Sequence, residues 1–378
     1  MPKAKKSVIF LDQYSSFGGG QRVLLQVVRA LKKAGNFNTQ PPVFALPLGG
    51  RLQRALQAEF GAEAQFISTR ELVLQSGTKG MIDLLKWMSF SVHTFLRLYF
   101  RANQFGCIYV NGGRLYLVGA AVSLLRGIPA IYHVHLNYGR FEKYLIFWLL
   151  KLRATSAVVV ASDFIREELV KAFPALNENS KLKVIENALS PQFSDLPWEN
   201  RFQDKSKSLR MVCVGLLCRD KGQDLAIKVA QMHPELEVHF FGRNAPGSEE
   251  WIRQLKETAT DNVVFHGEVE DLPRAIRQLR AHFSLVPSRW DEPFGLVAIE
   301  SMACSCITLL SGKGGLRSIA DKTGAFVFND ELSLHQIVGS LLGKPIEELA
   351  AVSQSQHDQV MSQYATERFD TRIALLFQ

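Results

Sequence analysis

VIFLDQYSSFGGGQRVLLQVVRAL, residues 8–31, passes from a short apolar run through a glycine-rich loop into a helical pattern. MVCVGLLCRDKGQDLAIKVA, residues 211–230, repeats this order in the second half of the chain. A strand, a loop and a helix in this order form the first unit of an open parallel sheet. The repetition predicts two domains, each beginning with its own strand, loop and helix.

Short apolar runs alternate with longer helical patterns along almost the whole chain. The runs cover residues 8–12, 42–46, 64–68, 107–111, 130–135, 157–162, 183–187, 211–215, 237–242, 263–268, 281–287, 306–312 and 324–328. Continuous rather than alternating apolar runs are typical of strands that are buried on both faces of a parallel sheet. The sequence therefore predicts an α/β fold with two doubly wound, Rossmann-like domains.

The length and one polar stretch locate the domain boundary. A chain of 378 residues with 47% hydrophobic residues can build two cores. Residues 188–208, ALSPQFSDLPWENRFQDKSKS, interrupt the apolar pattern with Pro, Ser, Asp and Lys. We predict an N-terminal domain at 1–190, a linker at 191–208 and a C-terminal domain at 209–365. Residues 366–378 are expected to form a helix that packs back on the N-terminal domain.

The charge is unevenly distributed between the two halves. Residues 1–187 hold 24 Lys and Arg against 11 Asp and Glu, whereas the remaining residues hold 20 against 25. A basic half favours an anionic partner, which leaves a membrane surface, a nucleic acid or an anionic acceptor open. No recognisable DNA- or RNA-binding motif is present, so no nucleic acid partner is expected. The spacing of the five cysteines fits no zinc site, and buried free thiols are expected.

Residues 81–101, MIDLLKWMSFSVHTFLRLYFR, form the most apolar helical pattern. Four charged or imidazole side chains interrupt it, so it does not predict a membrane span. Two interpretations remain: a buried helix with one polar stripe, or an interfacial helix that touches lipid. The basic and aromatic residues 139–153 resemble it in composition. Because the N-terminus lacks a signal-peptide pattern, we expect a cytoplasmic protein, with peripheral attachment to the inner face of the plasma membrane under the second interpretation.

Polar residues and glycines follow several predicted strands, where ligands bind in open parallel sheets. Gly19 and Gly20 open the first helix and let the backbone approach an anion. His133 and His135 alternate on one strand, so both imidazoles are expected on the same side, near Asn137. Asn187 ends another run, where it could cap a turn or contact a ligand.

WDEPFGLVAIE, residues 290–300, places Glu292 and Glu300 around a Pro-Phe-Gly turn. On spacing alone, Pro293 could open a helix, with Glu292 at its positive end and Glu300 solvated two turns further on. The alternative is that both carboxylates contact one ligand. Lys221, followed by Gly222 before another helix, can reach a phosphate or remain solvated.

Together these features resemble the retaining, nucleotide-sugar-dependent glycosyltransferases of family 4, which have the two-domain GT-B fold. The resemblance covers nearly the whole chain and depends on EPFGLVAIE (292–300), which matches the family's E-x7-E motif, GGGQR (18–22), VGLLCRDKGQD (214–224) and SGKGGLRSI (311–319). It implies that the first domain binds the acceptor and the second the nucleotide sugar.

The resemblance also implies roles for single residues. Glu292 would approach the donor sugar, Glu300 would hold the ribose hydroxyls, and Lys221 would neutralise the diphosphate. Further donor contacts would come from Gly19, Gly20, Arg219, Glu268 and Val269, and from the backbone near Gly295, Leu296 and Val297. His135 best matches a histidine near the sugar and acceptor, with His133 as the rival and Asn137 and Asn187 in the same region.

Two positions depart from the family pattern, because Leu216 stands where an arginine is usual and Ser318 where a glutamate is frequent. The resemblance implies sugar transfer to a hydroxyl acceptor in glycan, lipopolysaccharide or exopolysaccharide biosynthesis, with retained anomeric configuration. No D-x-D pair occurs, so no metal is expected. No cofactor is expected either, and the nucleotide-sugar donor is expected to be UDP- or GDP-linked rather than ADP-linked. The acceptor would be a glycan or a lipid-linked molecule. The alternatives are a nucleotide-sugar epimerase or synthase on the same fold and a catalytically silent sugar-nucleotide-binding protein.

Overall fold

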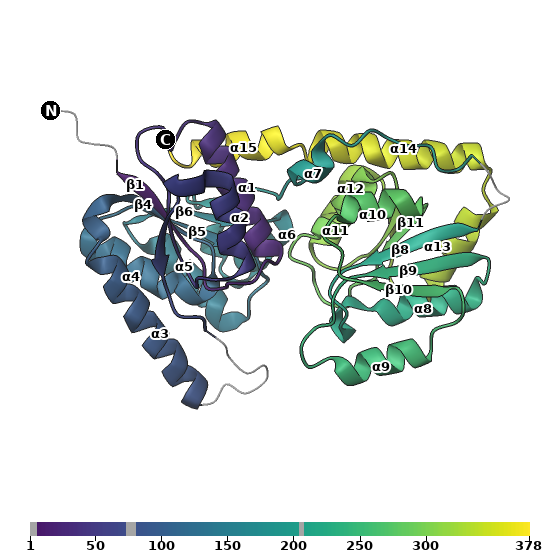
Figure 1. The fold of residues 1–378 in the computed structure, drawn as a ribbon, viewed down its shortest axis with the longest axis horizontal. Coiled ribbons are helices and arrows are strands. Elements are labelled where there is room, and N and C mark those ends of the chain that lie inside the picture. The colour runs from purple at the N-terminus through teal and green to yellow at the C-terminus, as the bar shows by residue number, and fades with distance from the viewer. Residues whose placement is uncertain (1–5, 73–80, 204–207) are drawn as a thin grey trace. The chain divides into compact units, whose positions relative to one another are not determined.

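The computed structural model describes residues 6–72, 81–203 and 208–378, which divide into two compact units. The first unit comprises residues 1–186 and 369–378, and the second comprises residues 187–368. Each unit contains one parallel sheet with helices packed against it (Figure 1). The predicted α/β fold of two doubly wound domains is confirmed.

The first unit contains a seven-stranded parallel sheet with the order β3-β2-β1-β4-β5-β6-β7. Its strands are β1 (Ser7–Leu11), β2 (Val43–Leu46), β3 (Gln65–Ser68), β4 (Phe105–Val110), β5 (Ala130–Val134), β6 (Thr155–Val160) and β7 (Leu182–Val184). Its helices are α1 (Gly19–Lys33), α2 (Arg51–Phe60), α3 (Met81–Tyr99), α4 (Tyr116–Arg126), α5 (Arg140–Lys151) and α6 (Asp163–Ala172), with short 3-10 turns η1 (Gly61–Glu63), η2 (Ala102–Gln104), η3 (Gly113–Leu115) and η4 (Pro174–Leu176).

The second unit contains a six-stranded parallel sheet with the order β10-β9-β8-β11-β12-β13. Its strands are β8 (Leu209–Val214), β9 (Leu236–Phe241), β10 (Val263–Gly267), β11 (Phe283–Val286), β12 (Ile307–Ser311) and β13 (Phe326–Phe328). Its helices are α7 (Pro191–Ser194), η5 (Arg219–Lys221), α8 (Gln223–Met232), α9 (Glu249–Glu257), α10 (Leu272–Leu279), α11 (Leu296–Ala303), α12 (Gly315–Thr323), α13 (Glu331–Gly343) and α14 (Ile346–Gln363).

The central strands are apolar on both faces because helices cover both sides of each sheet. In the first unit, Phe10, Phe44 and Tyr109 are fully buried, and the Phe10 ring contacts each of the other two at a centroid distance of 5.5 Å. Phe240 and Phe283 are buried in the second core. Each of the thirteen predicted runs overlaps one strand. In the central strands, burial on both faces explains the continuous apolar signal, whereas edge strands such as β10 are partly exposed.

The stretch predicted as a linker contains packed structure in its described part, residues 191–203. Phe193 and Phe202 are buried, and Trp198 Nε1 donates a hydrogen bond to Ser353 Oγ at 3.1 Å. These residues belong to the second unit. The chain ends in α15 (Thr366–Leu375), and residues 369–378 pack in the first unit, where Lys33 Nζ lies 2.8 Å from the Asp370 carboxylate.

The helix predicted at residues 81–101 forms as α3, but its packing differs from a buried helix with one polar stripe. Only Phe90, Thr94 and Leu98 of this helix are buried. Large apolar side chains on its remaining surface are exposed, including Met81 at 75% and Val92 at 57%. Among the described residues, no helix is long and apolar enough to cross a membrane.

Candidate functional site

The second unit pairs Glu292 with Lys221 where two strands end. Glu292 follows β11, and its Oε1 accepts hydrogen bonds from Lys221 Nζ and Ser288 Oγ, both at 2.5 Å. The side chain of Glu292 is 8% exposed and that of Lys221 is 29% exposed. Lys221 Nζ also lies 5.2 Å from the centre of the Trp290 ring, a cation–π distance. The carboxylate is thus fixed by two donors, while the cation keeps partial access to solvent.

Close backbone contacts hold the loops around Glu292. A parallel bridge joins Glu292 to Gly314 in the loop after β12, and Gly315 N donates to Glu292 O at 2.7 Å. Gly314 has a φ of +59°, and a Cβ there would overlap the Glu292 carbonyl. Gly222 has a φ of +67°, and a Cβ there would overlap the Pro287 carbonyl in the same way. The loops after β8, β11 and β12 can therefore meet only because glycine occupies these positions.

The helix that follows Glu292 is α11, and it begins at Leu296 with Gly295 as its N-cap. The interpretation from spacing alone, in which Pro293 opens the helix, placed this start three residues too early. No side chain caps this N-terminus in the described structure. The first amides of a helix lack partners within the helix, so those of Leu296 and Val297 present partial positive charge. This end of α11 is suited to an anion, and its contact with a diphosphate remains a prediction.

Glu300 lies on α11 and is only 2% exposed. The interpretation of Glu300 as a solvated helical residue is therefore wrong. Burying a carboxylate costs free energy unless polar groups hydrogen-bond to it, so solvation at the surface does not explain a glutamate at this position. Its predicted contact with ribose hydroxyls stays a prediction.

The remaining predicted donor residues lie at the ends of neighbouring elements. Arg219 is exposed at the start of η5, and Glu268 and Val269 directly follow β10, with Glu268 exposed. Leu216, where the family pattern has arginine, accepts a hydrogen bond from Gln223 Nε2 through its backbone carbonyl at 2.9 Å. Ser318 lies half-buried on α12. Arg219 thus supplies an exposed cation on the loop that lacks the usual arginine.

In the first unit, a buried polar cluster joins the carboxyl ends of β1, β4 and β5. Asp12, Asn111 and His135 directly follow these adjacent strands. Asn111 Nδ2 donates to Asp12 Oδ2 at 2.6 Å and to Gly20 O at 3.2 Å. Gln21 Nε2 lies 3.2 Å from both oxygens of Asp12. Burial raises the pKa of Asp12, whereas the hydrogen bonds from Asn111, Tyr14 and Gln21 lower it.

This cluster fixes the orientation of His135. Because Asn111 Nδ2 faces two acceptors, its Oδ1 faces the His135 ring, 2.7 Å from Nε2. His135 Nε2 must therefore carry the proton, which leaves Nδ1 as the acceptor of the neutral ring. Burial lowers the pKa of His135 to about 4, so the ring is neutral at pH 7. His135 can accept a proton or a hydrogen bond there, but it is not a cation.

His133 lies beside His135, as the alternation predicted, with ring centroids 4.1 Å apart. It is fully buried, and its Nδ1 lies 2.5 Å from the Tyr109 hydroxyl. Burial lowers its pKa well below the usual range. The half-buried His135 is thus the more accessible of the two. Gly19 and Gly20 begin α1, and a Cβ at Gly20 would lie 3.4 Å from His135 Cδ2.

Asn137 and Asn187, which were predicted to lie near the acceptor or sugar, each have a side-chain oxygen that accepts no hydrogen bond among the described residues. Asn187 is 5% exposed and Asn137 is half-buried. Their predicted contacts with acceptor or sugar stay predictions. In the described part of the chain, no three His, Cys, Asp or Glu side chains group as a metal site would require.

Sequence reasoning missed Asp12, Asn111 and Ser288. Asp12 and Asn111 are the polar residues that end two of the apolar runs, and this position at a strand end was the available signal. Ser288 lies two residues after β11, four residues before Glu292. Its role depends on the conformation of that loop, which the sequence pattern does not specify.

Comparison with known proteins identifies relatives of both units. Residues 17–193 match the family "Glycosyltransferase Family 4", and residues 197–356 match "Glycosyl transferases group 1". Mannosylfructose-phosphate synthase of Agrobacterium fabrum is 38% identical over 120 residues, which cover 28% of this chain and 26% of that protein. D-inositol 3-phosphate glycosyltransferase of Xylanimonas cellulosilytica is 32% identical over 130 residues, which cover 32% of this chain and 31% of that protein. The chain thus aligns with less than a third of either relative.

A solved structure of HepE from Anabaena, in complex with UDP and glucose, has the same fold. It superposes with a TM-score of 0.77 at 18% sequence identity and covers 99% of both chains. The two family matches cover nearly all of this chain, one in each unit. The resemblance noted in the sequence is therefore confirmed: the chain belongs to the family 4 glycosyltransferases.

Proposed function

We propose that the protein transfers a sugar from a nucleotide sugar to a hydroxyl group of an acceptor, with retention of the anomeric configuration. The observation that carries this proposal is the convergence of the Lys221–Glu292 pair with the uncapped N-terminus of α11. A cation and helix amides beside one another can stabilise the charge of a departing diphosphate. The names of the relatives support a sugar-transfer reaction over a purely structural role.

The proposed donor is a UDP- or GDP-linked sugar, with UDP favoured by the ligand of the HepE structure. Glu300 and the backbone after β10 would bind the nucleoside, while Arg219, Lys221 and the α11 amides would bind the diphosphate. Glu292, held by Lys221 and Ser288, would orient the sugar. The absence of a D-x-D pair from the sequence supports transfer that does not need a metal.

In the proposed reaction, the bond from the anomeric carbon to the phosphate oxygen breaks while a bond to the acceptor oxygen forms on the same face. The acceptor proton moves to the departing phosphate oxygen, so no residue needs to become a covalent nucleophile. His135 would accept a hydrogen bond through its neutral Nδ1 and so orient a hydroxyl. The acceptor we propose is a glycan or lipid-linked sugar at the inner face of the plasma membrane.

Two variants and one control test this function. Lys221→Ala and Glu292→Gln should each reduce UDP release from UDP-glucose about 100-fold or more, as expected when a charge-stabilising group is lost. Lys228→Ala removes a cation on α8 that pairs with Glu331 and should have no effect. NMR of the product should show the anomeric configuration of the donor, and activity should persist in EDTA. Unchanged turnover in both site variants would refute the proposal, and donor binding without turnover in the wild type would identify a silent binding protein.

A further inference from the structure

The first unit exposes an unusual concentration of large apolar side chains. Of the 20 large hydrophobic residues exposed in the described structure, 15 lie within residues 81–148, fewer than a fifth of the described residues. They come from α3, α4 and α5, and from the segments that follow α3 and β5. Isolated exposed apolar residues are ordinary, but a concentrated patch marks an interaction surface.

The stripe on α3 faces away from the protein core. Met81, Leu85, Met88, Val92 and Leu96 lie within about 80° of one another at 100° per residue. Their exposed fractions range from 45% to 75%. The buried residues of this helix lie on the opposite side, centred about 160° away. The outward stripe therefore does not contribute to the core of the first unit.

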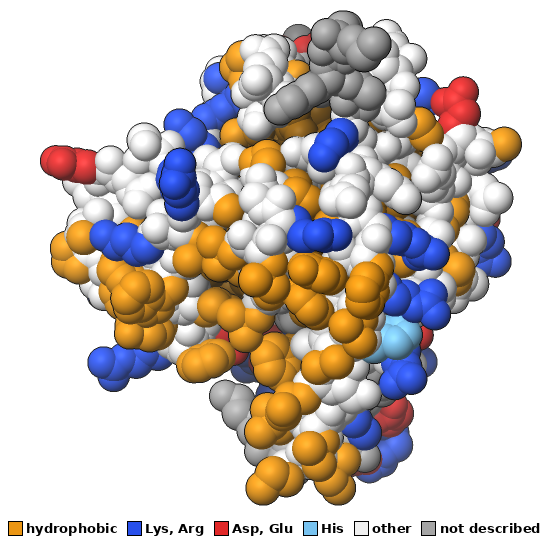
Figure 2. Space-filling model, turned by 90° about the vertical axis from the view of Figure 1, so that its left-hand side faces the viewer, with side chains coloured by type: hydrophobic (Ala, Val, Ile, Leu, Met, Phe, Trp, Pro, Cys, Tyr) orange, Lys and Arg blue, Asp and Glu red, His pale blue; other side chains and the backbone are white. Residues whose placement is uncertain are grey.

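Neighbouring helices extend the stripe into a continuous face. α3 packs against α4, which exposes Leu117, Leu124 and Leu125. We call the exposed apolar residues of these two helices the α3–α4 face. Figure 2 shows an apolar band across this side of the molecule, with Lys and Arg side chains along its borders. Residues 81–153 hold nine Lys and Arg against two Asp and Glu.

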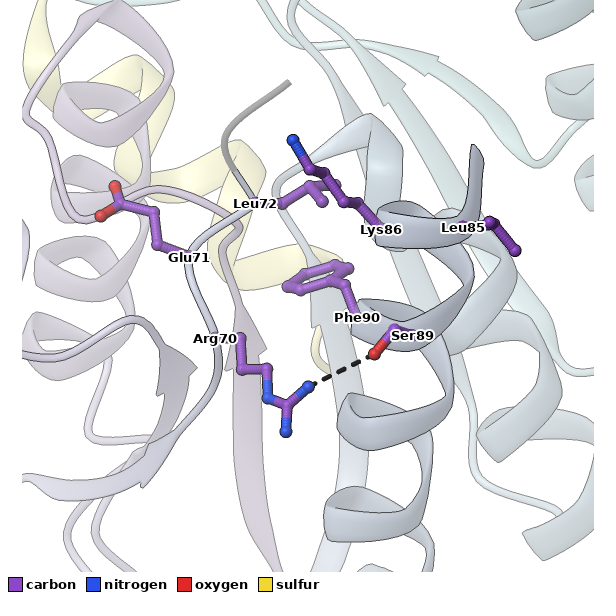
Figure 3. A pocket seen from close by; sticks show the side chains of 7 residues that line it. All are labelled: Arg70, Glu71, Leu72, Leu85, Lys86, Ser89 and Phe90. Atoms are coloured by element: carbon purple, nitrogen blue, oxygen red, sulfur yellow. Dashed lines mark hydrogen bonds between the residues drawn. The ribbon is translucent and has the colours of Figure 1, made fainter. Parts of the chain in front are cut away.

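A cavity beside α3 brings two cations next to the apolar stripe. It has a volume of about 510 Å³ and is lined by Arg70, Glu71, Leu72, Leu85, Lys86, Ser89 and Phe90. Arg70 Nη1 donates to Ser89 Oγ at 3.3 Å, and Lys86 lies on the other side of the Phe90 ring (Figure 3). The carboxylate of Glu71 accepts a hydrogen bond from Ser15 Oγ at 2.6 Å. The cavity combines positive charge with apolar walls, as an anionic headgroup with its acyl chain requires.

We propose that the α3–α4 face docks on a lipid bilayer that contains anionic lipids. Aliphatic side chains would enter the interface, and Lys86, Arg97 and Arg101 would contact lipid phosphates. A second copy of this chain fits the face less well, because it would bring two basic borders together. This inference depends on the first unit alone, so its failure would leave the proposed sugar transfer unaffected.

Sedimentation with vesicles tests the surface. The full chain should sediment with phosphatidylcholine vesicles that contain 30% phosphatidylglycerol, and about tenfold less with phosphatidylcholine alone. Met88→Glu/Val92→Glu, which changes two exposed residues, should reduce the partition coefficient at least tenfold. Lys86→Gln/Arg97→Gln should reduce it by a similar factor and remove most of its salt dependence. Met232→Glu/Leu332→Glu, which adds the same charge at exposed positions of the second unit, is the matched control.

The outcomes separate the possible occupants. Circular dichroism and analytical ultracentrifugation of each variant establish that it folds and report its oligomeric state. Absent sedimentation of the wild type with acidic vesicles, or equal losses in the stripe and control variants, would overturn the proposal. A dimer in the wild type that Met88→Glu/Val92→Glu dissociates, without vesicle binding, would instead assign the face to a second copy of this chain.

Discussion

Replacing Asn111 by leucine should destabilise the protein strongly, and more so at neutral pH than in acid. The side chain is 3% exposed, and its amide donates to Asp12 and Gly20 while its oxygen faces His135. Leucine has nearly the same volume, so the change removes hydrogen bonds without opening a large cavity. Asp12 would keep the Gln21 amide and the Tyr14 backbone N–H as donors.

The magnitude follows from the contacts that are lost. A hydrogen bond to a charged group contributes about 1.5–3 kcal/mol, and each buried polar atom left unpaired costs about 1–3 kcal/mol. Because the Asp12–Asn111 bond is short and buried, we expect the free energy of unfolding to fall by about 3 kcal/mol at pH 7. Guanidinium titrations followed by circular dichroism measure this loss.

The pH dependence gives the prediction a sign. Burial already raises the pKa of Asp12 in the folded state, and loss of the Asn111 donor raises it further. A group whose pKa is higher in the folded than in the unfolded state destabilises the fold most when it is ionised in both. The deficit of Asn111→Leu should therefore shrink as the pH falls from 7 through the folded pKa of Asp12.

A control at the half-buried Asn262 separates this effect from the loss of amide hydrogen bonds that involve no carboxylate. The Asn262 amide donates to the carbonyls of Ala230 and Leu236 at 2.9 and 2.8 Å, and to no carboxylate. Asn262→Leu should destabilise the protein by a similar amount, with a deficit that does not change with pH. A loss below about 1 kcal/mol for Asn111→Leu, or a deficit equally independent of pH, would refute the charge-linked role of Asn111.

The other predictions concern the donor loops and the histidine pair. Gly314→Ala should destabilise the protein by about 2 kcal/mol or more and weaken UDP binding measured by calorimetry, because the added Cβ overlaps the Glu292 carbonyl; an equally stable variant would contradict the loop contact. Glu300→Gln should weaken UDP binding about tenfold with little change in the far-UV spectrum, and unchanged affinity would exclude a ribose contact. Because the pKa of His135 is about 4 in the fold and near 6.5 when unfolded, its contribution to stability should be lost as the pH falls from about 6.5 to 4. His135→Gln should reduce this slope in denaturation curves, and an unchanged slope would show that the ring titrates normally.

The strands and the glycine-containing loops were predictable because their signals are local. A strand covered on both faces is apolar at every position, and glycine in a loop between a strand and a helix permits close approach to another backbone. Gly314 and Gly222 illustrate this, since both have positive φ and abut a neighbouring loop. The packing of Glu300 was not predictable from its spacing to Glu292, because burial depends on which side of α11 faces the sheet.

The Asp12–Asn111–His135 cluster was unpredictable for a different reason. Its first two members lie 99 residues apart, and they meet because β4 pairs with β1 rather than with β3. The predicted doubly wound fold implies that β4 lies beside β1, but strand order alone does not specify which side chains at the strand ends meet. The outward stripe of α3 has a similar origin, because periodicity shows where apolar side chains gather but not whether the fold covers them.

The positions of the charges indicate that the basic residues of the first unit and the proposed donor site have separate functions. The cluster at the strand ends of the first unit contains a buried carboxylate, two amides and a neutral imidazole, so it supplies little positive charge to a diphosphate. The cations suited to that task are Arg219 and Lys221 of the second unit, which has the smaller share of basic residues. In residues 81–153 of the first unit, basic residues outnumber acidic ones nine to two, beside exposed apolar side chains. If the excess served the donor, Lys86→Gln/Arg97→Gln would lower UDP affinity; because it borders the α3–α4 face, we expect that variant to bind UDP normally and to lose only vesicle binding.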